Sequence, residues 1–447
     1  MKKVVKFGGS SLASAVQFKK VKAIMEADRS RRFVVPSAPG KRFDTDRKVT
    51  DMLYEYYDLA SLGNDMRMIR EEIHGRFLGI IHGLKLDLDL TEEFEKMESD
   101  FQKGYGRDYA ASRGEYLNGI ILAAYLQVPF IDAADVVCFD RNGIFLPELT
   151  NQRMRERLEN VESAVIPGFY GAEPDGRIRT FSRGGSDITG SLVARAVLAD
   201  LYENWTDVSG FLLADPRIVK NPVPISVITY KELHELSSMG ASVLHEDAVF
   251  PVKLENIPIN IRNTNRPEDP GTMIVGSTDR KPNFKITGIA GKKGFCAVNI
   301  SKPVTEECET ETAVKSLLDE KHIPYECIPS DHNRVSFLLP QDRFTDQEKA
   351  DLLGIKSLDD PALISWESDL ALVAVGVRGV KAKHRVAGRV TRALENANIS
   401  IKAMGRDGEE FTTLVGVKTA DFEPAVRAIY DNFIHRDPSV TGRVLSI

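Results

Sequence analysis

Two glycine pairs stand where an apolar strand pattern gives way to a helical pattern, and each has a cation beside it. The first is "KFGGSS" at residues 6–11 and the second is "SRGGSD" at residues 182–187. Glycine leaves successive backbone N–H groups open to an anion, and the following helix adds its positive N-terminal end. Lys6 would add a mobile point charge, and Arg183 a planar guanidinium suited to a carboxylate. The two turns predict anion binding, with a purely structural strand-to-helix turn as the alternative for each.

Two further stretches carry polar groups at informative places. Glu115 lies in "RGEYLNG", inside a helical pattern, where a glutamate is more often a solvated charge, so by itself it indicates no function. The stretch "ENWTDVSGFLLADPR" at 203–217 ends an apolar strand at Thr206 and Asp207 and then bends twice. Open α/β sheets bind ligands at the carboxyl ends of their strands, so this stretch favours a ligand-binding loop.

Several functional classes are disfavoured by what the sequence lacks. No GxxxxGK[ST] occurs and no GxGxxG follows a strand pattern, which argues against a P-loop ATPase and a nicotinamide dehydrogenase. The net charge of −6 argues against a nucleic-acid or anionic-membrane partner. The four cysteines have no metal-type spacing, and we expect no protein metal site. With no leader pattern and no long apolar run, we expect a cytoplasmic protein.

The elements that would position these residues alternate between strand and helix over residues 1–280. This pattern predicts a mostly parallel-sheet αβα sandwich. The expected strands include 3–7 and 32–40, and the continuous apolar runs 128–139 and 163–171 are typical of buried parallel strands. A hairpin is expected around Pro-Asp-Gly in 172–181. The expected helices are 50–62, 64–83, 91–102, 107–127 and 186–201.

A different pattern follows a Pro- and Gly-rich stretch at 264–285, where we place a domain boundary. The order βαββαβ occurs twice, which predicts two ferredoxin-like modules at 286–367 and 368–447. The strand at 286–290 could instead pair with the second module, and the last expected strand is 444–447.

Taken together, the chain resembles the aspartate kinases of the amino acid kinase superfamily. "KFGGSSLA", "SAPGKR", "RGE", "SRGGSDITG", "TDVSGF" and "MGASVLH" occur in that family's order, and the double βαββαβ tail resembles its paired ACT regulatory modules. The resemblance implies ATP-dependent phosphorylation of the side-chain carboxylate of L-aspartate to 4-phospho-L-aspartate, the first step towards lysine, threonine and methionine. It also implies Mg²⁺ held mainly by the nucleotide, and a homodimer or larger homo-oligomer formed through the ACT modules.

The resemblance also implies a role for each matching position. The residues expected at the nucleotide are Lys6, Phe7, Gly8, Gly9, Thr206, Asp207, Leu212, Arg217, Ser242 and Val243. Those expected at the substrate are Thr50, Glu115, Arg183, Gly184, Gly185 and Ser186. Among them Arg183 clamps the α-carboxylate of aspartate, Glu115 binds its amine, and Thr50 is the hydroxyl neighbour. Lys6 and Asp187 are the expected catalytic pair, with Asp187 orienting Lys6.

The chain departs from the family pattern in its nucleotide region. Leu212 stands where a tyrosine is common, Ser242 where a phosphate-contacting lysine is common, and Glu246 where a proline is usual. One cation is therefore missing from the expected phosphate pocket. Either a substitute supplies the charge or nucleotide affinity is lower; the candidate substitutes are Arg217, Lys220 and Lys253.

Regulation by an amino acid is expected from the first module. Ser330-Asp331 resembles the Ser-acid pair of lysine-inhibited aspartate kinases, so we expect lysine as the effector, with threonine open as a joint effector at the second module. Two other functions stay open: a kinase for glutamate or a related acid, and an amino-acid sensor built on a degenerate kinase.

Overall fold

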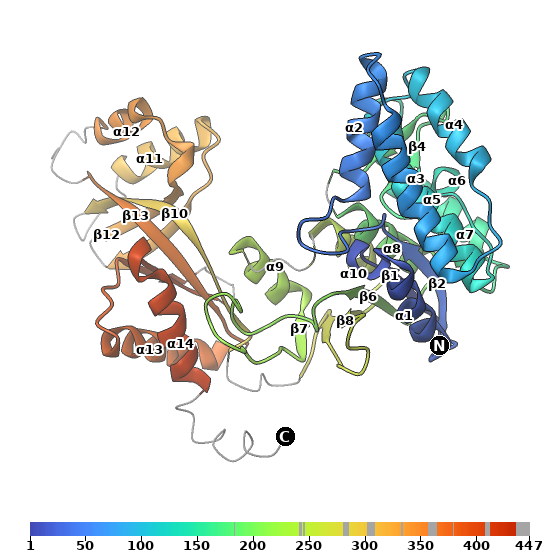
Figure 1. The fold of residues 1–447 in the computed structure, drawn as a ribbon. Coiled ribbons are helices and arrows are strands. Elements are labelled where there is room, and N and C mark those ends of the chain that lie inside the picture. Colours follow the sequence, from blue (N-terminus) through green and yellow to red (C-terminus); the bar gives the residue numbers. More distant parts are fainter. Residues whose placement is uncertain are drawn as a thin grey trace. The chain divides into compact units, whose positions relative to one another are not determined.

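The computed structural model describes residues 1–182, 184–240, 244, 246–279, 286–301, 309–331, 334–355, 364–378, 380–406 and 412–434 (Figure 1). Contacts divide the chain into two compact units. The first contains residues 1–211, 226–230 and 243–278, and the second contains 212–225, 231–242 and 279–447.

The first unit is built on a seven-stranded sheet in the order β3-β2-β1-β6-β8-β9-β7. All neighbouring strands run parallel except β8 and β9. The expected parallel-dominated sheet is therefore confirmed. The strands are β1 Lys3–Phe7, β2 Arg31–Pro36, β3 Ala164–Val165, β6 Leu201–Thr206, β7 Val227–Thr229, β8 Ile259–Asn263 and β9 Thr272–Val275.

Helices cover both faces of this sheet. Side chains alternate between the two faces along each strand, so neighbouring residues of one strand contact different helices. Val5 and Phe7 of β1 point into the core formed with the helices α1–α5, whereas Lys6 points to the face covered by α8. These helices are α1 Ala15–Glu26, α2 Val49–Ser61, α3 Arg67–Leu84, α4 Thr91–Gln102, α5 Arg107–Leu126 and α8 Gly185–Ala196. Shorter elements of the unit are η1 Gly9–Leu12, α7 Pro147–Leu158, η2 Glu246–Ala248 and α10 Phe250–Leu254.

One expected strand is wrong. Residues 128–139 form only isolated bridges at Phe130, Cys138 and Phe139, and a short helix, α6 Ala133–Val136, interrupts them. The reason is local: the Asp132 carboxylate accepts a hydrogen bond from the N–H of Ala134 at 3.0 Å and so caps a helical turn. The expected run 163–171 is divided between β3 and β4 Tyr170–Ala172, and β4 forms the expected hairpin with β5 Ile178–Thr180.

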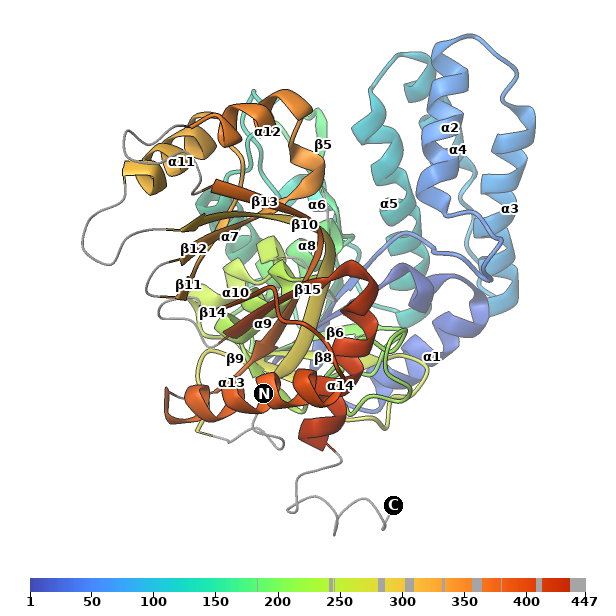
Figure 2. The same ribbon diagram turned by 90° about the vertical axis from the view of Figure 1, so that its left-hand side faces the viewer.

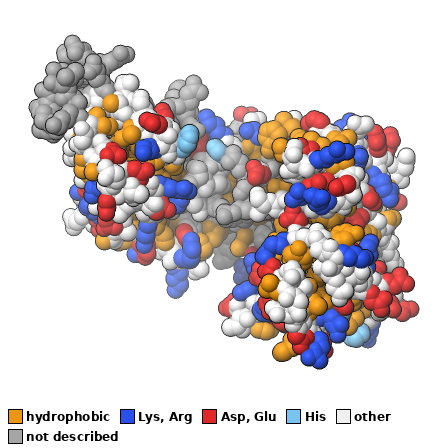
Figure 3. Space-filling model, turned by 90° about the horizontal axis from the view of Figure 1, so that it is seen from above, with side chains coloured by type: hydrophobic (Ala, Val, Ile, Leu, Met, Phe, Trp, Pro, Cys, Tyr) orange, Lys and Arg blue, Asp and Glu red, His pale blue; other side chains and the backbone are white. Residues whose placement is uncertain are grey.

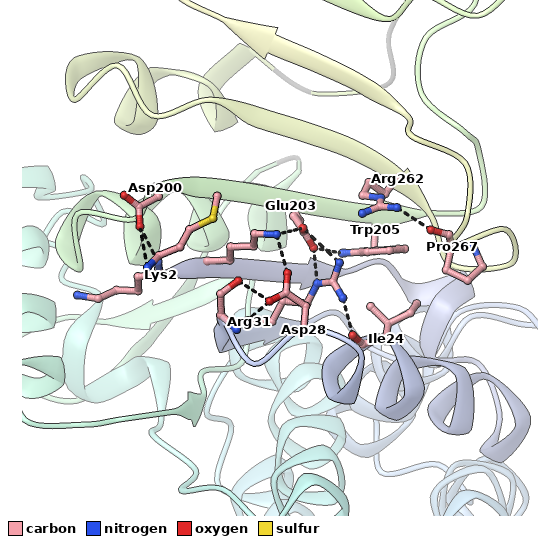
Figure 4. Close-up of polar contacts among 12 residues, drawn as sticks. Lys2, Ile24, Asp28, Arg31, Asp200, Glu203, Trp205, Arg262 and Pro267 are labelled. Carbon is pink, nitrogen blue, oxygen red and sulfur yellow. Dashed lines mark hydrogen bonds and ion pairs between the residues drawn. The ribbon is translucent and has the colours of Figure 1, made fainter.

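A buried ion network ties three strands of the sheet together (Figure 4). Glu203 of β6 is 1% exposed and accepts hydrogen bonds from Arg31 Nε at 2.7 Å and Trp205 Nε1 at 2.9 Å. Lys3 of β1 lies 3.3 Å from Glu203 and 2.7 Å from Asp28. Burial by itself raises the pKa of Glu203, but the hydrogen bond and charge of Arg31, with Trp205 and Lys3, outweigh it and lower that pKa. The carboxylate is thus held ionised inside the protein.

We expect Glu203→Gln to lower the free energy of unfolding by about 3 kcal/mol, because the change leaves buried cations without their counter-charge. Urea unfolding measures this. Glu162→Gln is the matched control, since Glu162 is 87% exposed and lies 3.9 Å from its partner Arg32. Equal stability of the Glu203 and Glu162 variants would contradict a structural role for the network.

The second unit is built on a six-stranded antiparallel sheet in the order β11-β12-β10-β13-β15-β14. Two long strands, β10 Gly288–Ser301 and β13 Ile364–Gly376, serve both expected modules. The amino-terminal half of β10 pairs with the carboxyl-terminal half of β13, and its other half also pairs with β12. Strand β13 thus runs without a break across the expected boundary between the modules at 367 and 368, and the expected strand 444–447 lies outside the described residues. The remaining strands are β11 Glu326–Asp331, β12 Arg334–Pro340, β14 Ala403–Arg406 and β15 Thr412–Lys418.

Helices pack at both ends of these long strands (Figure 2). Helix α11 Glu309–Glu320 and helix α12 Asp346–Leu353 close one core, around Val314, Leu318 and Phe337. Helices α13 Val380–Asn396 and α14 Phe422–Ile434 pack on the other module. Short 3₁₀ turns are η3 Gln341–Arg343 and η5 Thr419–Asp421.

Two segments from inside the expected first domain belong to the second unit. In segment 212–225 the Leu213 carbonyl accepts the N–H of Ile289 at 2.7 Å, and the Val223 N–H donates to the Tyr430 hydroxyl at 3.0 Å. In helix α9 Tyr230–Ser238, Glu232 receives two hydrogen bonds from Arg378 at 2.8 and 2.7 Å. The ACT-like modules therefore hold these two segments directly.

Acidic and basic side chains are interspersed on the face of the molecule seen in Figure 3. Among the described helices, none is long and apolar enough to cross a membrane.

Candidate active site

Lys6 and Asp187 form the centre of the site. Lys6 Nζ lies 2.6 Å from Asp187 Oδ1, and the same oxygen accepts a hydrogen bond from Asn204 Nδ2 at 2.7 Å. Asn204 on β6 is the register partner of Lys6 on β1, so both face α8, which carries Asp187 in its first turn. The lysine side chain is only 10% exposed. Asn204 is a site residue that the sequence motifs did not indicate.

The first glycine pair is packed against the segment that follows β2. A Cβ on Gly9 would lie 2.9 Å from the Ala38 carbonyl oxygen, and one on Gly40 would lie 2.6 Å from the carbonyl carbon of Gly9. The Gly40 N–H donates to the Gly9 carbonyl at 2.8 Å. The two backbones approach so closely that neither position accepts a side chain. Phe7 is fully buried and stacks on Trp205, and its carbonyl accepts the Ser37 N–H at 3.0 Å, so its side chain is not available to a ligand.

The second glycine pair makes an equally tight turn into α8. Gly184 has φ 58°, in the left-handed region, and a Cβ on Gly185 would lie 2.6 Å from the ring of Phe169. Phe169 itself has φ 81°, which is a strained conformation for a bulky residue. Its N–H donates to Thr189 Oγ1 at 3.1 Å. The strained Phe169 therefore packs directly against the second glycine turn, and no sequence pattern had singled it out.

Ser186 is buried in the first turn of α8. Gly168 packs closely against it, because a Cβ added at Gly168 would lie 2.6 Å from the Cβ of Ser186. Arg183, the expected α-carboxylate clamp, lies outside the described residues.

A cavity of 540 Å³ joins several predicted residues in the first unit. It is lined by Gly9, Ser10, residues 37–44, Lys48, Thr50, Glu115 and Asp207. One cavity therefore contacts the first glycine turn at Gly9 and Ser10, the expected substrate residues Thr50 and Glu115, and the expected nucleotide residue Asp207. The cations of residues 37–48 were not among the predicted site residues.

Glu115 is the most strongly perturbed acid of this cavity. It lies on α5, is 6% exposed, and its Oε2 has no hydrogen-bond partner within the described part of the chain. Burial raises the pKa of Glu115 to about 8, although the Ala38 N–H and the charge of Lys6 oppose this. One helical turn later, Asn118 Nδ2 donates to the Ser37 carbonyl at 2.7 Å and fixes α5 against the cavity wall. The arrangement suits a cationic ligand group, which would supply the missing partner.

The expected nucleotide residues fall into both units. Thr206 is the last residue of β6 in the first unit and Asp207 follows it, with Thr206 Oγ1 donating to Asp207 Oδ1 at 3.2 Å. Leu212 and Arg217 belong to the second unit. Arg217 is 87% exposed and is bound by Asp215 at 2.6 Å. Ser242 and Val243 lie outside the described residues, as do the side chains of the expected effector residues Ser330 and Asp331 on β11.

No group of three or more His, Cys, Asp or Glu side chains that could hold a metal ion occurs in the described ranges.

Comparison with known proteins gives consistent matches along the whole chain. The model of the amino acid kinase family matches residues 1–263, and an ACT domain model matches residues 373–433. Aspartokinase 3 of Bacillus subtilis is 34% identical over 96% of this chain and 98% of its own length. The crystal structure of Clostridium acetobutylicum aspartate kinase is 43% identical with a TM-score of 0.84, covering 97% of this chain and 100% of that one. Escherichia coli aspartokinase III in complex with aspartate and ADP shares the fold, with a TM-score of 0.71 at 22% identity over 97% of this chain and 99% of that one.

Proposed function

This chain belongs to the aspartate kinases of the amino acid kinase family, and from this membership we propose that it transfers the terminal phosphoryl group of ATP to the side-chain carboxylate of L-aspartate. The product is 4-phospho-L-aspartate, the first intermediate towards lysine, threonine and methionine. The observation that best supports the proposal is the single cavity in which Glu115 and the Gly9 turn meet, beside the Lys6–Asp187 pair.

Phosphoryl transfer to a carboxylate requires positioning and positive charge rather than a general base. The attacking carboxylate is already ionised at neutral pH. Lys6 would meet the charge that develops on the transferring phosphoryl group, and Asp187 with Asn204 holds its ammonium in place. Glu115 would bind the substrate amine, and Arg183 its α-carboxylate. Mg²⁺ would bridge the phosphates of ATP and bind mostly through ATP oxygens and water, so we assign it no protein ligand.

ADP release measured with aspartate and with glutamate tests this proposal. We expect aspartate to give a kcat/KM at least about 100-fold higher than glutamate, because an added methylene displaces the reacting carboxylate from the phosphoryl group. A preference for glutamate would support the other acyl-phosphate-forming kinase. Binding of aspartate without any ADP release would support a degenerate-kinase sensor.

Lysine is the proposed effector, on the resemblance at Ser330 and Asp331. A carboxylate at the effector site favours a cationic amino acid, and inhibition follows if lysine prefers a state in which the kinase is less competent. The second unit contains segment 212–225 as well as the ACT-like modules, which supports a route from effector to nucleotide residues. Threonine as a joint effector is part of the same proposal, as is a homo-oligomer formed through the ACT modules.

We expect lysine to inhibit the wild type and Asp331→Ala to abolish this inhibition while leaving uninhibited turnover unchanged. Initial rates over a lysine titration measure both quantities, and Asp342→Ala in the same module is the control. Lysine inhibition that persists unchanged in Asp331→Ala, or its absence from the wild type, would overturn the effector assignment.

A further inference from the structure

We propose that Lys41 binds the phosphate groups of ATP and supplies the cation that Ser242 does not, an inference that rests on the proposed kinase function. Lys41 belongs to the loop 40–48, which connects the segment after β2 to helix α2. It lines the same cavity as Gly9, Ser10 and Asp207.

The loop begins directly against the first glycine turn. The Gly40 N–H donates to the Gly9 carbonyl at 2.8 Å, and a Cβ on Gly40 would lie 2.8 Å from the Ser10 nitrogen. The Cα atom of Lys41 is one residue, about 3.8 Å, further on. The Gly8 N–H donates to the Trp205 carbonyl at 3.0 Å, so the Gly9 N–H is the anion donor that the turn would offer. A lysine side chain extends about 6 Å from its Cα, so the Lys41 ammonium can reach an anion seated on the Gly9 N–H.

Hydrogen bonds from helix α3 and within the loop itself fix the loop in place. Arg76 of α3 is 6% exposed; it donates from Nη2 to the Gly40 carbonyl at 2.6 Å and from Nη1 to Asp46 at 2.7 Å. Asp46 also accepts the N–H of Arg42 at 2.8 Å. The hydrogen bond from the Val49 N–H to the Pro39 carbonyl at 3.3 Å closes the loop at its base. A loop held at both ends keeps the Cα of residue 41 beside the glycine turn.

The cations of the loop differ in whether a carboxylate already binds them. The guanidinium of Arg42 is bound by Asp46 at 2.8 and 2.9 Å, and Arg47 is paired with Glu55 and Glu72. Lys41 is exposed, and its Nζ donates to the carbonyl of Asp44 at 3.2 Å. A neutral carbonyl is a weak competitor for an ammonium beside a polyanion, so ATP would draw Lys41 away from it.

Lys48 is the other lysine that lines the cavity, at the opposite end of the loop. It immediately precedes α2, two residues before Thr50, an expected substrate residue. Lys48 is therefore nearer in sequence to the expected substrate residues. Lys41 directly follows Gly40, which is hydrogen-bonded to the glycine turn, whereas Lys48 does not.

The test compares Lys41→Met, Lys41→Arg and Lys48→Met with Lys19→Met, a control on the exposed side of α1. We expect Lys41→Met to raise the Kd of ADP, measured by calorimetry without aspartate, about tenfold, and to lower kcat/KM for ATP by about 10- to 100-fold. The KM for aspartate should change less than about twofold. Lys41→Arg should keep most of the affinity because it keeps the charge. Adding Ser242→Lys to Lys41→Met should restore nucleotide affinity.

The outcomes separate this inference from the proposed function. A wild type without aspartate-dependent ADP release would overturn the proposed function itself. An active wild type in which Lys41→Met binds ADP like the Lys19→Met control would overturn only the role of Lys41. A nucleotide defect in Lys48→Met and not in Lys41→Met would also overturn it.

Discussion

Replacing Lys6 with alanine is expected to lower kcat by about 10³-fold or more while the protein stays folded. Its ammonium is held 2.6 Å from Asp187 and lies beside the first glycine turn, since a Cβ on Gly8 would lie 3.7 Å from Lys6 Nζ. Preorganised donors of this kind contribute most when charge develops in the transition state, and removal of one neutral donor already costs 10² to 10³ in rate. A full charge at the transferring phosphoryl group should contribute at least as much. Steady-state ADP release measures the loss.

Two controls make this result specific to Lys6. Aspartate binding without nucleotide should survive in Lys6→Ala, because the expected substrate residues Glu115 and Arg183 are unchanged. Lys20→Ala on α1 should keep full turnover, since the hydrogen bond of its Nζ goes to the exposed Asn265 side chain at 2.8 Å, outside the candidate site. A folded Lys6→Ala protein with turnover within tenfold of the wild type would remove Lys6 from the catalytic role.

Two strands of the sheet serve the site on one face and stability on the other. On β6, Glu203 points into the ion network with Arg31, and its neighbour Asn204 points to Asp187. On β1, Lys6 is the catalytic candidate, and Phe7 beside it is buried in the helical core. Because side chains alternate along a strand, the network that fixes β1 against β6 also fixes the spacing of Lys6 and Asn204. Sequence alternation shows the two faces but not which partners they meet.

The sequence was sufficient to predict those elements that depend on local structure alone. The helices of 50–127 and the hairpin at Pro-Asp-Gly follow from periodicity and turn chemistry. The strand prediction for residues 128–139 was wrong because a continuous apolar run does not distinguish a buried strand from buried irregular structure. Here the cap at Asp132 favours a helical turn. The left-handed Phe169 and the docking of segment 212–225 on the second unit depend on tertiary contacts, which no local pattern encodes.

In the candidate site, too, local motifs located some residues, whereas others depend on tertiary contacts. Motifs located Lys6, Glu115 and Asp187, because their residue types and neighbours are distinctive. They did not locate Lys41, whose importance depends on the hydrogen bond between Gly40 and Gly9, residues that lie far apart in the sequence.

Glu115→Gln is the second change for which we expect a large effect, with the KM for aspartate rising about 100-fold and kcat falling much less. Oε2 of Glu115 is buried and has no partner in the described part of the chain, so an ammonium group fits it and an amide does not replace the charge. Truncating one side of a buried charge pair costs about 2–5 kcal/mol, which corresponds to about 30- to 5,000-fold and so includes the expected increase.

The same residue predicts a pH dependence whose sign is fixed by its raised pKa. Burial raises the pKa of Glu115 to about 8 in the ligand-free protein, so below that pH the carboxyl is mostly protonated. An ammonium ligand binds the ionised form, and the proton must leave first. We therefore expect the KM for aspartate to fall about tenfold per unit as pH rises from about 6.5 to 8 and then to level off. Glu115→Gln should give a high KM that is flat over this range, and Glu95→Gln, exposed on α4, should keep the wild-type profile. A wild-type KM that does not vary between these pH values would show that Glu115 does not meet the substrate amine.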